Sequence, residues 1–426
     1  MSDTPVNETS ARDPVPTGSG ALSGLRVLDL SRVLAGPWCT QILADLGAEV
    51  IKIERPGVGD DTRHWGPPFL KDADGRDTTE ATYFTATNRN KKSVTLDLAK
   101  PEAQALLRKM AAESDVLVEN FKVGGLKAYG LDYESLKDVN PRLVYCSITG
   151  FGQTGPYAPR AGYDLLVQAS SGMMSITGRP DDEPGGGGMR VGVAITDVFT
   201  GIYASTAILA ALHARHATGR GQYIDLALLD VGMAILANQA SAFLNTGKAP
   251  MRQGNSHPSI VPYQDFPTSD GAMLLAIGND GQFARFCDQA GHPQWADDPR
   301  YSRNTARVSN RDTLVPMMSA VTRTRTTEQW VTLLGPVGVP CGPINDIEQA
   351  FADPQVAARG LRIVQQRAAG SAVAAITGVA SPLRLSEHPP VLRNAPPVLG
   401  EHTEEVLARF GIGPDQVAAM RQAGIV

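Results

Sequence analysis

Short apolar segments alternate with helical segments between residues 25 and 150, and this alternation limits the fold more than any other feature of the chain. The segments RVLDL (26–30) and EVIKI (49–53) have the composition of buried strands, and residues 38–46 between them fit a helix with Pro37 in its first turn. Two strands joined by a crossover helix form a right-handed parallel unit. Further strands are expected at 94–98, 115–118 and 143–149, and a helix at 101–113. We therefore predict an α/β fold built on an open, Rossmann-like parallel sheet.

A ligand should bind in the loops after these strands, because ligands of open parallel sheets lie outside the carboxyl ends of the strands. The loop at residues 31–37 lacks the G-x-G-x-x-G sequence, which argues against NAD or a flavin dinucleotide as cofactor. The chain also lacks a Walker A sequence, the zinc-binding sequence H-E-x-x-H and the serine-hydrolase sequence G-x-S-x-G. Four glycines at 185–188 fit a flexible loop, since no Lys-Ser or Lys-Thr follows them. We expect no metal, NAD or flavin.

The overall charge argues against a nucleic-acid partner, since the formal net charge is −5 and the pI is about 5.8. A local basic cluster of Arg89, Lys91 and Lys92 fits either a small anionic ligand or a solvated face. The four cysteines show no zinc or redox spacing and are expected to be reduced, buried thiols of a cytoplasmic protein.

Neither of two candidate segments is expected to engage a membrane. Residues 1–20 are polar and have no apolar core of a signal peptide, so they are predicted to form a disordered tail. The most apolar helical stretch, residues 201–212, is too short to span a bilayer.

Several longer sequence blocks, in a fixed order from residue 22 to 426, resemble the class III CoA-transferases, which include formyl-CoA transferase, carnitine CoA-transferase and the 2-methylacyl-CoA racemases. They include VLDLSRVLAGP (27–37), DVLVENF (115–121), NPRLVYCSITGFGQTGP (140–156) and TGRGQYID (218–225). Within the family, GDDTRHWGPPF (59–69), NRNKKS (88–93) and HPSIVPYQ (257–264) are most similar to transferases that act on succinyl-CoA and glutarate or a related dicarboxylate. The resemblance implies acyl-CoA and a carboxylic acid as substrates.

The resemblance also implies a catalytic residue, Asp197, in the segment GVAITD (192–197). In isolation, an Asp before an apolar helical run is usually a helix N-cap. The two roles are compatible, because a helix N-terminus would favour the ionised carboxylate. In the transferases the matching Asp attacks the acyl-CoA thioester, forms a mixed anhydride and then carries CoA as an aspartyl thioester, which implies the same steps for Asp197.

CoA contacts can be carried over by position from the resemblance. The predicted contacts are Leu34, Ala35, Arg55, Leu96, Asp97, Leu98, Ala99, Asn120, Phe121, Lys122, Ala128, Arg160, Ala161, Gly162 and Tyr163. Alanine stands at three of them, 99, 128 and 161, where formyl-CoA transferase has a Lys or Arg. The neighbouring basic residues, Lys100, Lys127 and Arg160, could replace those charges.

The substrate acid needs a cation for its distal carboxylate if it is a dicarboxylate. Arg63, Arg252 and His257 are the candidates. A glycine-rich loop that covers the site in formyl-CoA transferase matches GNSHPS (254–259) only loosely, which makes Gly254 and Asn255 further predicted substrate contacts.

Two alternative functions are racemisation and non-catalytic CoA binding. The racemases of the family use a His in a Gly-His-Asp sequence as a base, but this chain has Gly162-Tyr163-Asp164, and a tyrosine hydroxyl titrates too high to replace it. We therefore interpret Asp164 as a structural residue or as one that supports the catalytic group from behind. An intact Asp197 argues against a protein that only binds CoA.

The family fold implies an interlocked homodimer and a division of the chain. Residues 22–225 with 385–426 would form a large CoA-binding domain, and 250–360 a smaller mixed α/β domain. Residues 226–249 would be a linker helix and 361–384 a return linker.

Overall fold

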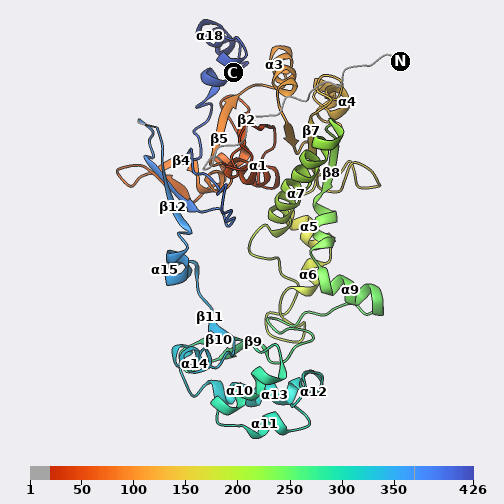
Figure 1. The fold of residues 1–426 in the computed structure, drawn as a ribbon, viewed down its shortest axis with the longest axis vertical. Coiled ribbons are helices and arrows are strands. Elements are labelled where there is room, and N and C mark those ends of the chain that lie inside the picture. Colours follow the sequence, from red (N-terminus) through yellow and green to blue (C-terminus); the bar gives the residue numbers. More distant parts are fainter. Residues whose placement is uncertain (1–19, 369) are drawn as a thin grey trace, which may run out of the picture. The chain divides into compact units, whose positions relative to one another are not determined.

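The computed structural model describes residues 20–368 and 370–426 (Figure 1). The chain divides into two compact units, each described below by itself. Unit 1 comprises Met1–Ser171, Gly192–Ile235 and Arg359–Val426, and unit 2 comprises Gly172–Val191 and Leu236–Ala358. The predicted tail at 1–20 lies outside the described residues except for Gly20. That residue is buried so tightly that a Cβ atom would lie 2.4 Å from the Leu46 carbonyl oxygen.

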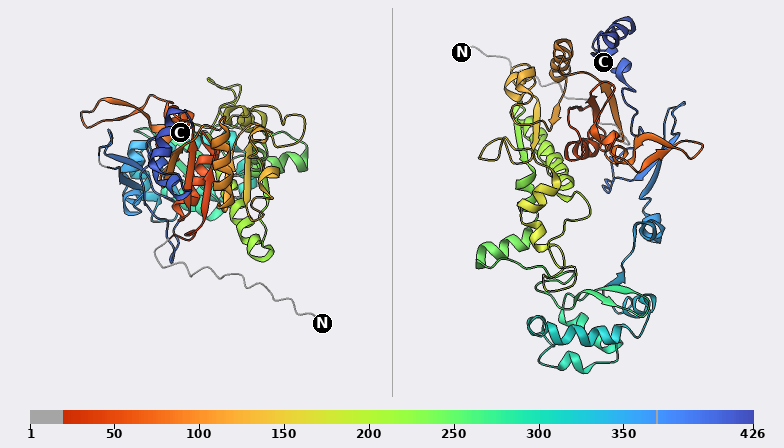
Figure 2. Two further views of the ribbon diagram at one scale, coloured as in Figure 1. Left: turned by 90° about the horizontal axis from the view of Figure 1, so that it is seen from above. Right: turned by 180° about the vertical axis from the view of Figure 1, so that it is seen from behind.

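A six-stranded parallel sheet forms the centre of unit 1 and confirms the predicted fold class (Figures 1 and 2). Its order is β5-β2-β1-β6-β7-β8. The strands are β1 (Arg26–Asp29), β2 (Glu49–Glu54), β5 (Lys91–Thr95), β6 (Val116–Glu119), β7 (Val144–Thr149) and β8 (Tyr223–Ala227). The direction of strand progression reverses between β1 and β6, and such a switch point is where open α/β sheets bind ligands.

Side chains alternate between two faces of this sheet, as the period of two in a strand requires. Leu28, Ile51 and Leu117 pack on one face with α3 (Pro101–Ala112), α17 (Thr403–Arg409) and α18 (Pro414–Gln422). Val27, Val50 and Val116 pack on the other with α1 (Ala35–Asp45) and α7 (Ile195–Thr218). A strand buried on both faces is mostly apolar, which is why β1 and β2 were recognisable in the sequence.

Helices α1 and α7 approach each other closely at Gly201. A Cβ atom at this position would lie 2.7 Å from the Ala35 carbonyl oxygen and 3.0 Å from the Trp38 side chain. The contact brings the first turn of α1 against the second turn of α7.

The predicted strand at 94–98 was wrong in its position, since β5 is Lys91–Thr95. Lys91 is fully buried inside the strand, where its ammonium donates to Asp29 Oδ2 at 3.1 Å and to the Pro37 carbonyl at 2.9 Å. The other two cations of the basic cluster also form ion pairs, Arg89 with Asp45 and Lys92 with Glu49. The three charges are therefore internal or paired, which argues against a ligand site.

Strand β8 was not among the strands predicted from the sequence. Gly219 adopts φ +70° at the end of α7, and the chain then pairs with β7 at the edge of the sheet. The expected linker helix at 226–249 is two helices, α8 (Leu228–Ala234) and α9 (Ala237–Thr246). The return linker contains a hairpin of β12 (Arg362–Gln366) and β13 (Ala375–Val379).

Helix α7 is longer than the apolar stretch at 201–212 suggested. Its 24 residues, Ile195–Thr218, are long and apolar enough to cross a membrane by length and composition, so the length argument was wrong. The helix instead has a packing role in the structure. It lies against α1 and the sheet, and its buried Arg215 forms an ion pair with Asp115 at 2.8 Å.

Unit 2 has an antiparallel sheet of β9 (Tyr263–Pro267), β10 (Ala272–Ala276) and β11 (Cys341–Pro343). Its core includes Phe266, Phe286 and the fully buried Trp330. Helices of this unit are α6 (Met173–Ile176), α9, α10 (Asp280–Gln289), α11 (Gln294–Asp297), α12 (Asn304–Ser309), α13 (Arg311–Thr322), α14 (Thr327–Leu334), α15 (Ile347–Ala352) and α16 (Pro354–Ala358). The remaining elements of unit 1 are η1 (Asp61–Arg63), β3 (Phe69–Lys71), β4 (Asp77–Ala81), α2 (Thr82–Thr85), η2 (Lys127–Tyr129), α4 (Tyr133–Leu136) and α5 (Asp164–Ser170).

Candidate active site

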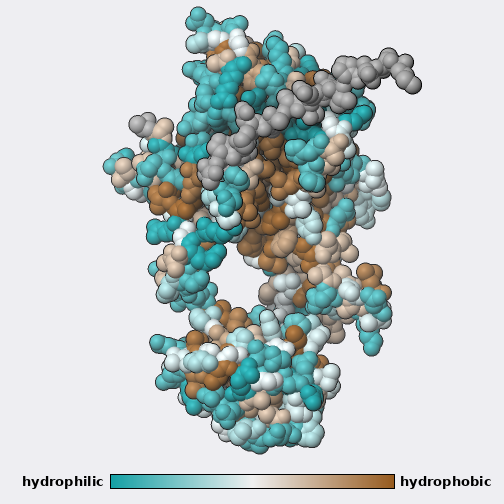
Figure 3. Space-filling view, in the orientation of Figure 1, coloured by the Kyte–Doolittle hydropathy of each residue, from teal (hydrophilic) through white to brown (hydrophobic). Residues whose placement is uncertain are grey.

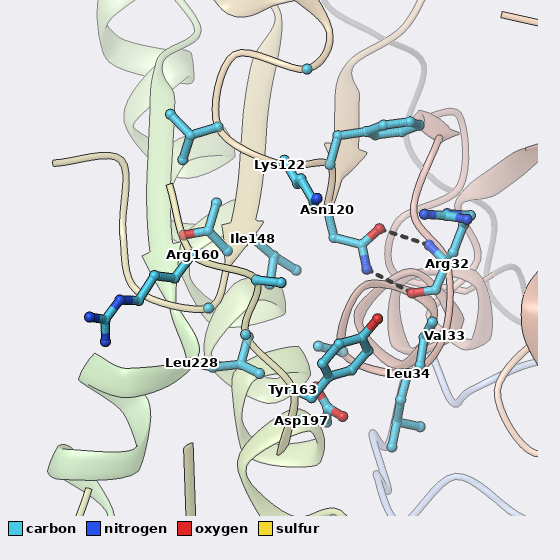
Figure 4. Close-up of a pocket in the computed structure, with 18 of the residues that line it drawn as sticks. Arg32, Val33, Leu34, Asn120, Lys122, Ile148, Arg160, Tyr163, Asp197 and Leu228 are labelled. Atoms are coloured by element: carbon cyan, nitrogen blue, oxygen red, sulfur yellow. Dashed lines mark hydrogen bonds between the residues drawn. The ribbon is translucent and has the colours of Figure 1, made fainter. Parts of the chain in front are cut away.

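A cavity of about 600 Å³ opens at the switch point of the sheet, beyond the carboxyl ends of β1, β6 and β7 (Figure 4). A second cavity of about 420 Å³ lies beyond β2 and β5, and the two share Arg32, Asp61, Phe121 and Tyr129. Both therefore lie where the sheet topology predicts a ligand.

The predicted CoA contacts fall into these two cavities with one exception. The first cavity is lined by Leu34, Ala35, Asn120, Phe121, Lys122, Arg160, Ala161, Gly162, Tyr163 and Asp197. The second is lined by Arg55, Leu96, Asp97, Leu98, Ala99 and Phe121. Ala128 lines neither cavity and is exposed on η2. Of the three basic residues proposed as replacements, Arg160 lies at the first cavity, whereas Lys127 lines a third cavity and Lys100 lines none of the three.

Asp197 lies in the first turn of α7 but is not its N-cap, which is Ala194. The capping carboxylate comes from Asp164, at the start of α5. Its Oδ1 accepts hydrogen bonds from the Thr196 backbone N–H at 2.9 Å and the Thr196 hydroxyl at 2.6 Å. The simple N-cap interpretation of Asp197 was therefore wrong, and the structural role predicted for Asp164 is confirmed. Because another residue caps the helix, the Asp197 carboxylate is available for chemistry.

The environment of Asp197 disfavours its charge. Burial and, as the smaller cause, the nearby charge of Asp164 together raise the pKa of Asp197 to about 7. We expected the helix N-terminus to favour the ionised form, but desolvation and the neighbouring carboxylate outweigh that effect. Near neutral pH, the site thus holds a carboxylate that is poorly solvated and close to its titration point.

Two glycines bring the segment 160–163 onto the end of β7. The Cα atom of Gly150 would lie 2.2 Å from a Cβ atom at Gly162, so only glycine allows the two backbones to approach this closely. Tyr163, next in the chain, is 65% exposed and lines the same cavity as Asp197 (Figure 4). The Gly162 position is consequently structural as well as part of the cavity wall.

Sequence reasoning missed Arg32. Its backbone N–H donates to Asn120 Oδ1 at 2.9 Å, and its carbonyl accepts from Asn120 Nδ2 at 2.7 Å (Figure 4). Its guanidinium pairs with Asp61 at 3.0 Å and lies 5.8 Å from the centre of the Phe121 ring. Its place in the loop after the first strand was a usable signal, because that loop borders the switch point.

Tyr83 was also missed, since nothing in the sequence marks it. It lies on α2, and its ring packs edge-on against Trp65, which lines the first cavity, with the ring centres 5.5 Å apart. Burial raises the pKa of Tyr83, and the charge of Asp197 raises it further, which places the two side chains near each other.

The residues predicted to bind the substrate acid do not form one group within either unit. Arg63 is buried, and its guanidinium donates to both carboxylate oxygens of Glu54 at 2.7 and 2.8 Å. Glu54 therefore already balances the charge of Arg63, which argues against its role in recognising a distal carboxylate.

The other candidates belong to unit 2. Arg252 pairs with Asp181 and donates to the Ser175 carbonyl. Gly254 has φ +58°, Asn255 donates to Asp265 at 3.1 Å, and His257 Nδ1 accepts from the Ser259 backbone N–H at 3.1 Å. Their substrate contacts stay a prediction. In the part of the chain that the structure describes, no cluster of three or more His, Cys, Asp or Glu residues could hold a metal ion.

Comparisons with known proteins agree on one family. Residues 22–403 match the family model CoA-transferase family III. A succinate--glutarate CoA-transferase of Agrobacterium fabrum is 52% identical over 396 residues, which are 93% of this chain and 97% of the relative. The succinyl-CoA:glutarate CoA-transferase of Homo sapiens is 42% identical over 409 residues, 95% of this chain and 90% of the relative. A solved CAIB/BAIF family protein from Brucella suis is 48% identical, with a TM-score of 0.80 and coverage of 92% of this chain and 99% of that chain.

The raised pKa of Asp197 predicts a pH-dependent gain in stability from Asp197→Asn. The folded state pays for ionising this group, and the penalty grows as pH rises from the unfolded pKa of 3.8 to the folded value of about 7, then stays level. Asn carries no charge, so the variant should melt above the wild type by about 2–4 °C at pH 8 and by less near pH 4. Thermal unfolding across this range measures the difference.

Asp230 provides a matched control, since it occupies the same third position of helix α8 with an exposed side chain. Asp230→Asn should show no gain that grows with pH. A gain for Asp197→Asn that does not change with pH would contradict the burial of the charge.

Proposed function

Because the chain belongs to CoA-transferase family III, we propose that it moves CoA from succinyl-CoA to a dicarboxylic acid such as glutarate, with Asp197 carrying the CoA between them. The names of the relatives from Agrobacterium fabrum and Homo sapiens support these acids. The role proposed for Asp197 rests on the surroundings of its carboxylate. It lines the first cavity, is partly buried, and receives no hydrogen bond from the residues that the structure describes.

A desolvated carboxylate is a competent nucleophile toward a thioester. One Asp197 oxygen attacks the succinyl carbonyl, the C–S bond breaks, and CoA leaves as a thiolate, which produces a mixed anhydride. The thiolate then attacks the Asp197 carbonyl, and succinate leaves with its carboxylate. This step produces an aspartyl-CoA thioester.

The second half of the reaction reverses these steps with the acceptor acid. A glutarate carboxylate attacks the aspartyl thioester and releases the CoA thiolate, which then attacks the glutaryl carbonyl of the new anhydride. Glutaryl-CoA forms, and the Asp197 carboxylate is regenerated. The pKa of about 7 keeps a large fraction of Asp197 ionised at neutral pH, as each attack by this group requires.

The phosphates of CoA would be bound by cations around the two cavities. Arg32, Lys122 and Arg160 line the first cavity, and Arg55 lines the second. Arginine suits phosphate because its planar fork donates two parallel hydrogen bonds. Formyl-CoA transferase has a basic residue at the position of Ala161. Arg160 lies beside Ala161, which supports the proposal that Arg160 replaces that charge.

Asp197→Ala should lower the rate of CoA transfer from succinyl-CoA to glutarate by at least about 1,000-fold, because the covalent carrier is lost. Asp230→Ala, the matched change on α8, should retain activity. The wild type should be assayed in parallel with glutarate, other C4–C6 dicarboxylates and butyrate. Turnover with butyrate alone would contradict the dicarboxylate assignment, and an active Asp197→Ala variant would contradict the carrier role.

We further propose that the protein is a homodimer. Large apolar side chains are exposed along α5, α7 and α8 of unit 1, where Figure 3 shows apolar surface: Leu165, Leu166, Phe199, Ile202, Tyr203 and Met233. Such a surface is unusual for a monomer and fits a contact with a second copy. The interlocked arrangement rests on the family resemblance, and the cytoplasmic location on the sequence alone.

Light scattering coupled to gel filtration should yield twice the chain mass of 45.2 kDa at micromolar concentration. A mass of one chain under these conditions would exclude the dimer.

A further inference from the structure

The loop that forms one wall of the first cavity contains a backbone conformation that its residue disfavours. Val33 has φ +72°, in the left-handed region where a β-branched residue is a rare outlier. Its neighbours Arg32 and Leu34 line the cavity, as does Val33 itself (Figure 4). Such strain persists only where the surrounding structure holds it in place, and it is common at active sites and ligand-binding sites.

A buried ion pair fixes the position of this loop. Both carboxylate oxygens of Asp60 lie 3.2 Å from the Val33 backbone nitrogen, whose N–H they share. The ammonium of Lys52 donates to Asp60 Oδ2 at 2.9 Å and to the Ser31 carbonyl at 2.8 Å. Asp60 is 1% exposed and Lys52 is 0% exposed, so water does not compete for these bonds. The pair thus binds the loop at Ser31 and at Val33, on both sides of Arg32.

Asp60 also fixes a second segment of the cavity wall. It is the N-cap of η1, where its Oδ1 accepts from the Thr62 backbone N–H at 3.0 Å and the Thr62 hydroxyl at 2.8 Å. Asp61, in η1, and Trp65, just beyond it, line the first cavity. One carboxylate therefore connects the loop after β1 to the segment after β2.

We propose that Asp60, supported by Lys52, is a positioning residue that keeps Val33 in its left-handed conformation and so keeps the cavity ready for the acyl-CoA. The inference rests on the proposed function in so far as it takes CoA to be the ligand of this cavity. Without the bond from Asp60, Val33 relaxes toward negative φ, and the fraction of molecules with a competent cavity falls. Apparent affinity then falls by that same fraction, while kcat at saturation changes much less.

If Asp60 acts by holding Val33 at positive φ, the effect of Asp60→Asn on CoA affinity should depend on the residue at position 33. In otherwise wild-type protein, the substitution should weaken CoA binding at least about fivefold, because strained conformations of this kind lose most of their population when unsupported. In the Val33→Gly background, it should weaken binding by less than about twofold, since glycine adopts positive φ without strain. Isothermal titration calorimetry with CoA measures both ratios, and KM for succinyl-CoA should follow them. Equal ratios in the two backgrounds would overturn the proposal.

Asp45→Asn is the matched control for loss of a buried paired carboxylate. Asp45 is buried in the same unit and accepts from Arg89 and Asn90, but it makes no bond to the loop. Its replacement should lower Tm and leave the dissociation constant for CoA within about twofold of the wild-type value. A comparable loss of affinity would show that instability, rather than loop position, weakens binding, and would overturn the proposal.

A comparison of two substitutions at Val33 tests the strain even if the Asp60→Asn variant does not fold. Val33→Gly and Val33→Ala both remove the side chain, but only glycine relieves the strain at φ +72°. Val33→Gly should therefore melt above Val33→Ala, and the reverse order would contradict the strain on which the inference depends.

These measurements are separate from a test of the transfer reaction. CoA binding can be compared among the variants whether or not the wild type transfers CoA to glutarate. If the wild type does not transfer CoA to glutarate, but Asp60→Asn weakens CoA binding more in the wild-type than in the Val33→Gly background, only the proposed function is rejected.

Discussion

The hydrogen bonds from the N-terminus of α7 to the Asp164 carboxylate are the interaction on which the site depends. By accepting from the Thr196 backbone and hydroxyl, Asp164 satisfies donors that a helix usually directs to its own N-cap side chain. Asp197 in the same turn is thereby released from a structural role. The same capping charge helps to raise the pKa of Asp197 to about 7, so one residue both frees the proposed nucleophile and adjusts its protonation.

The sheet topology accounts for where this carboxylate meets a ligand. Strand order reverses between β1 and β6, and the loops that diverge there leave the two cavities. Each wall is held by a specific backbone constraint. Gly150 and Gly162 meet without side chains between them, and the Lys52–Asp60 pair holds Val33 in a strained conformation. The binding surface is thus largely formed before any ligand arrives, which reduces the entropic cost of binding.

The sequence revealed those features that depend on local pattern. β1 and β2 were recognisable because strands buried on both faces are mostly apolar, and most predicted CoA contacts do line the two cavities. The start of β5 was not recognisable, because the buried charge of Lys91 is balanced by Asp29, a residue distant in the chain. Arg63 looked free to bind substrate until the structure paired it with Glu54, and Tyr83 near Asp197 left no local signal.

The central claim is that Asp197 accepts CoA during turnover, and mass spectrometry tests it most directly. The protein should be incubated with succinyl-CoA without an acceptor acid, then analysed intact and after proteolysis. We predict a mass gain equal to CoA minus water, located on the peptide that contains Asp197 and removed by hydroxylamine. Transfer of CoA to glutarate with no such adduct, or with the adduct on another residue, would contradict the account.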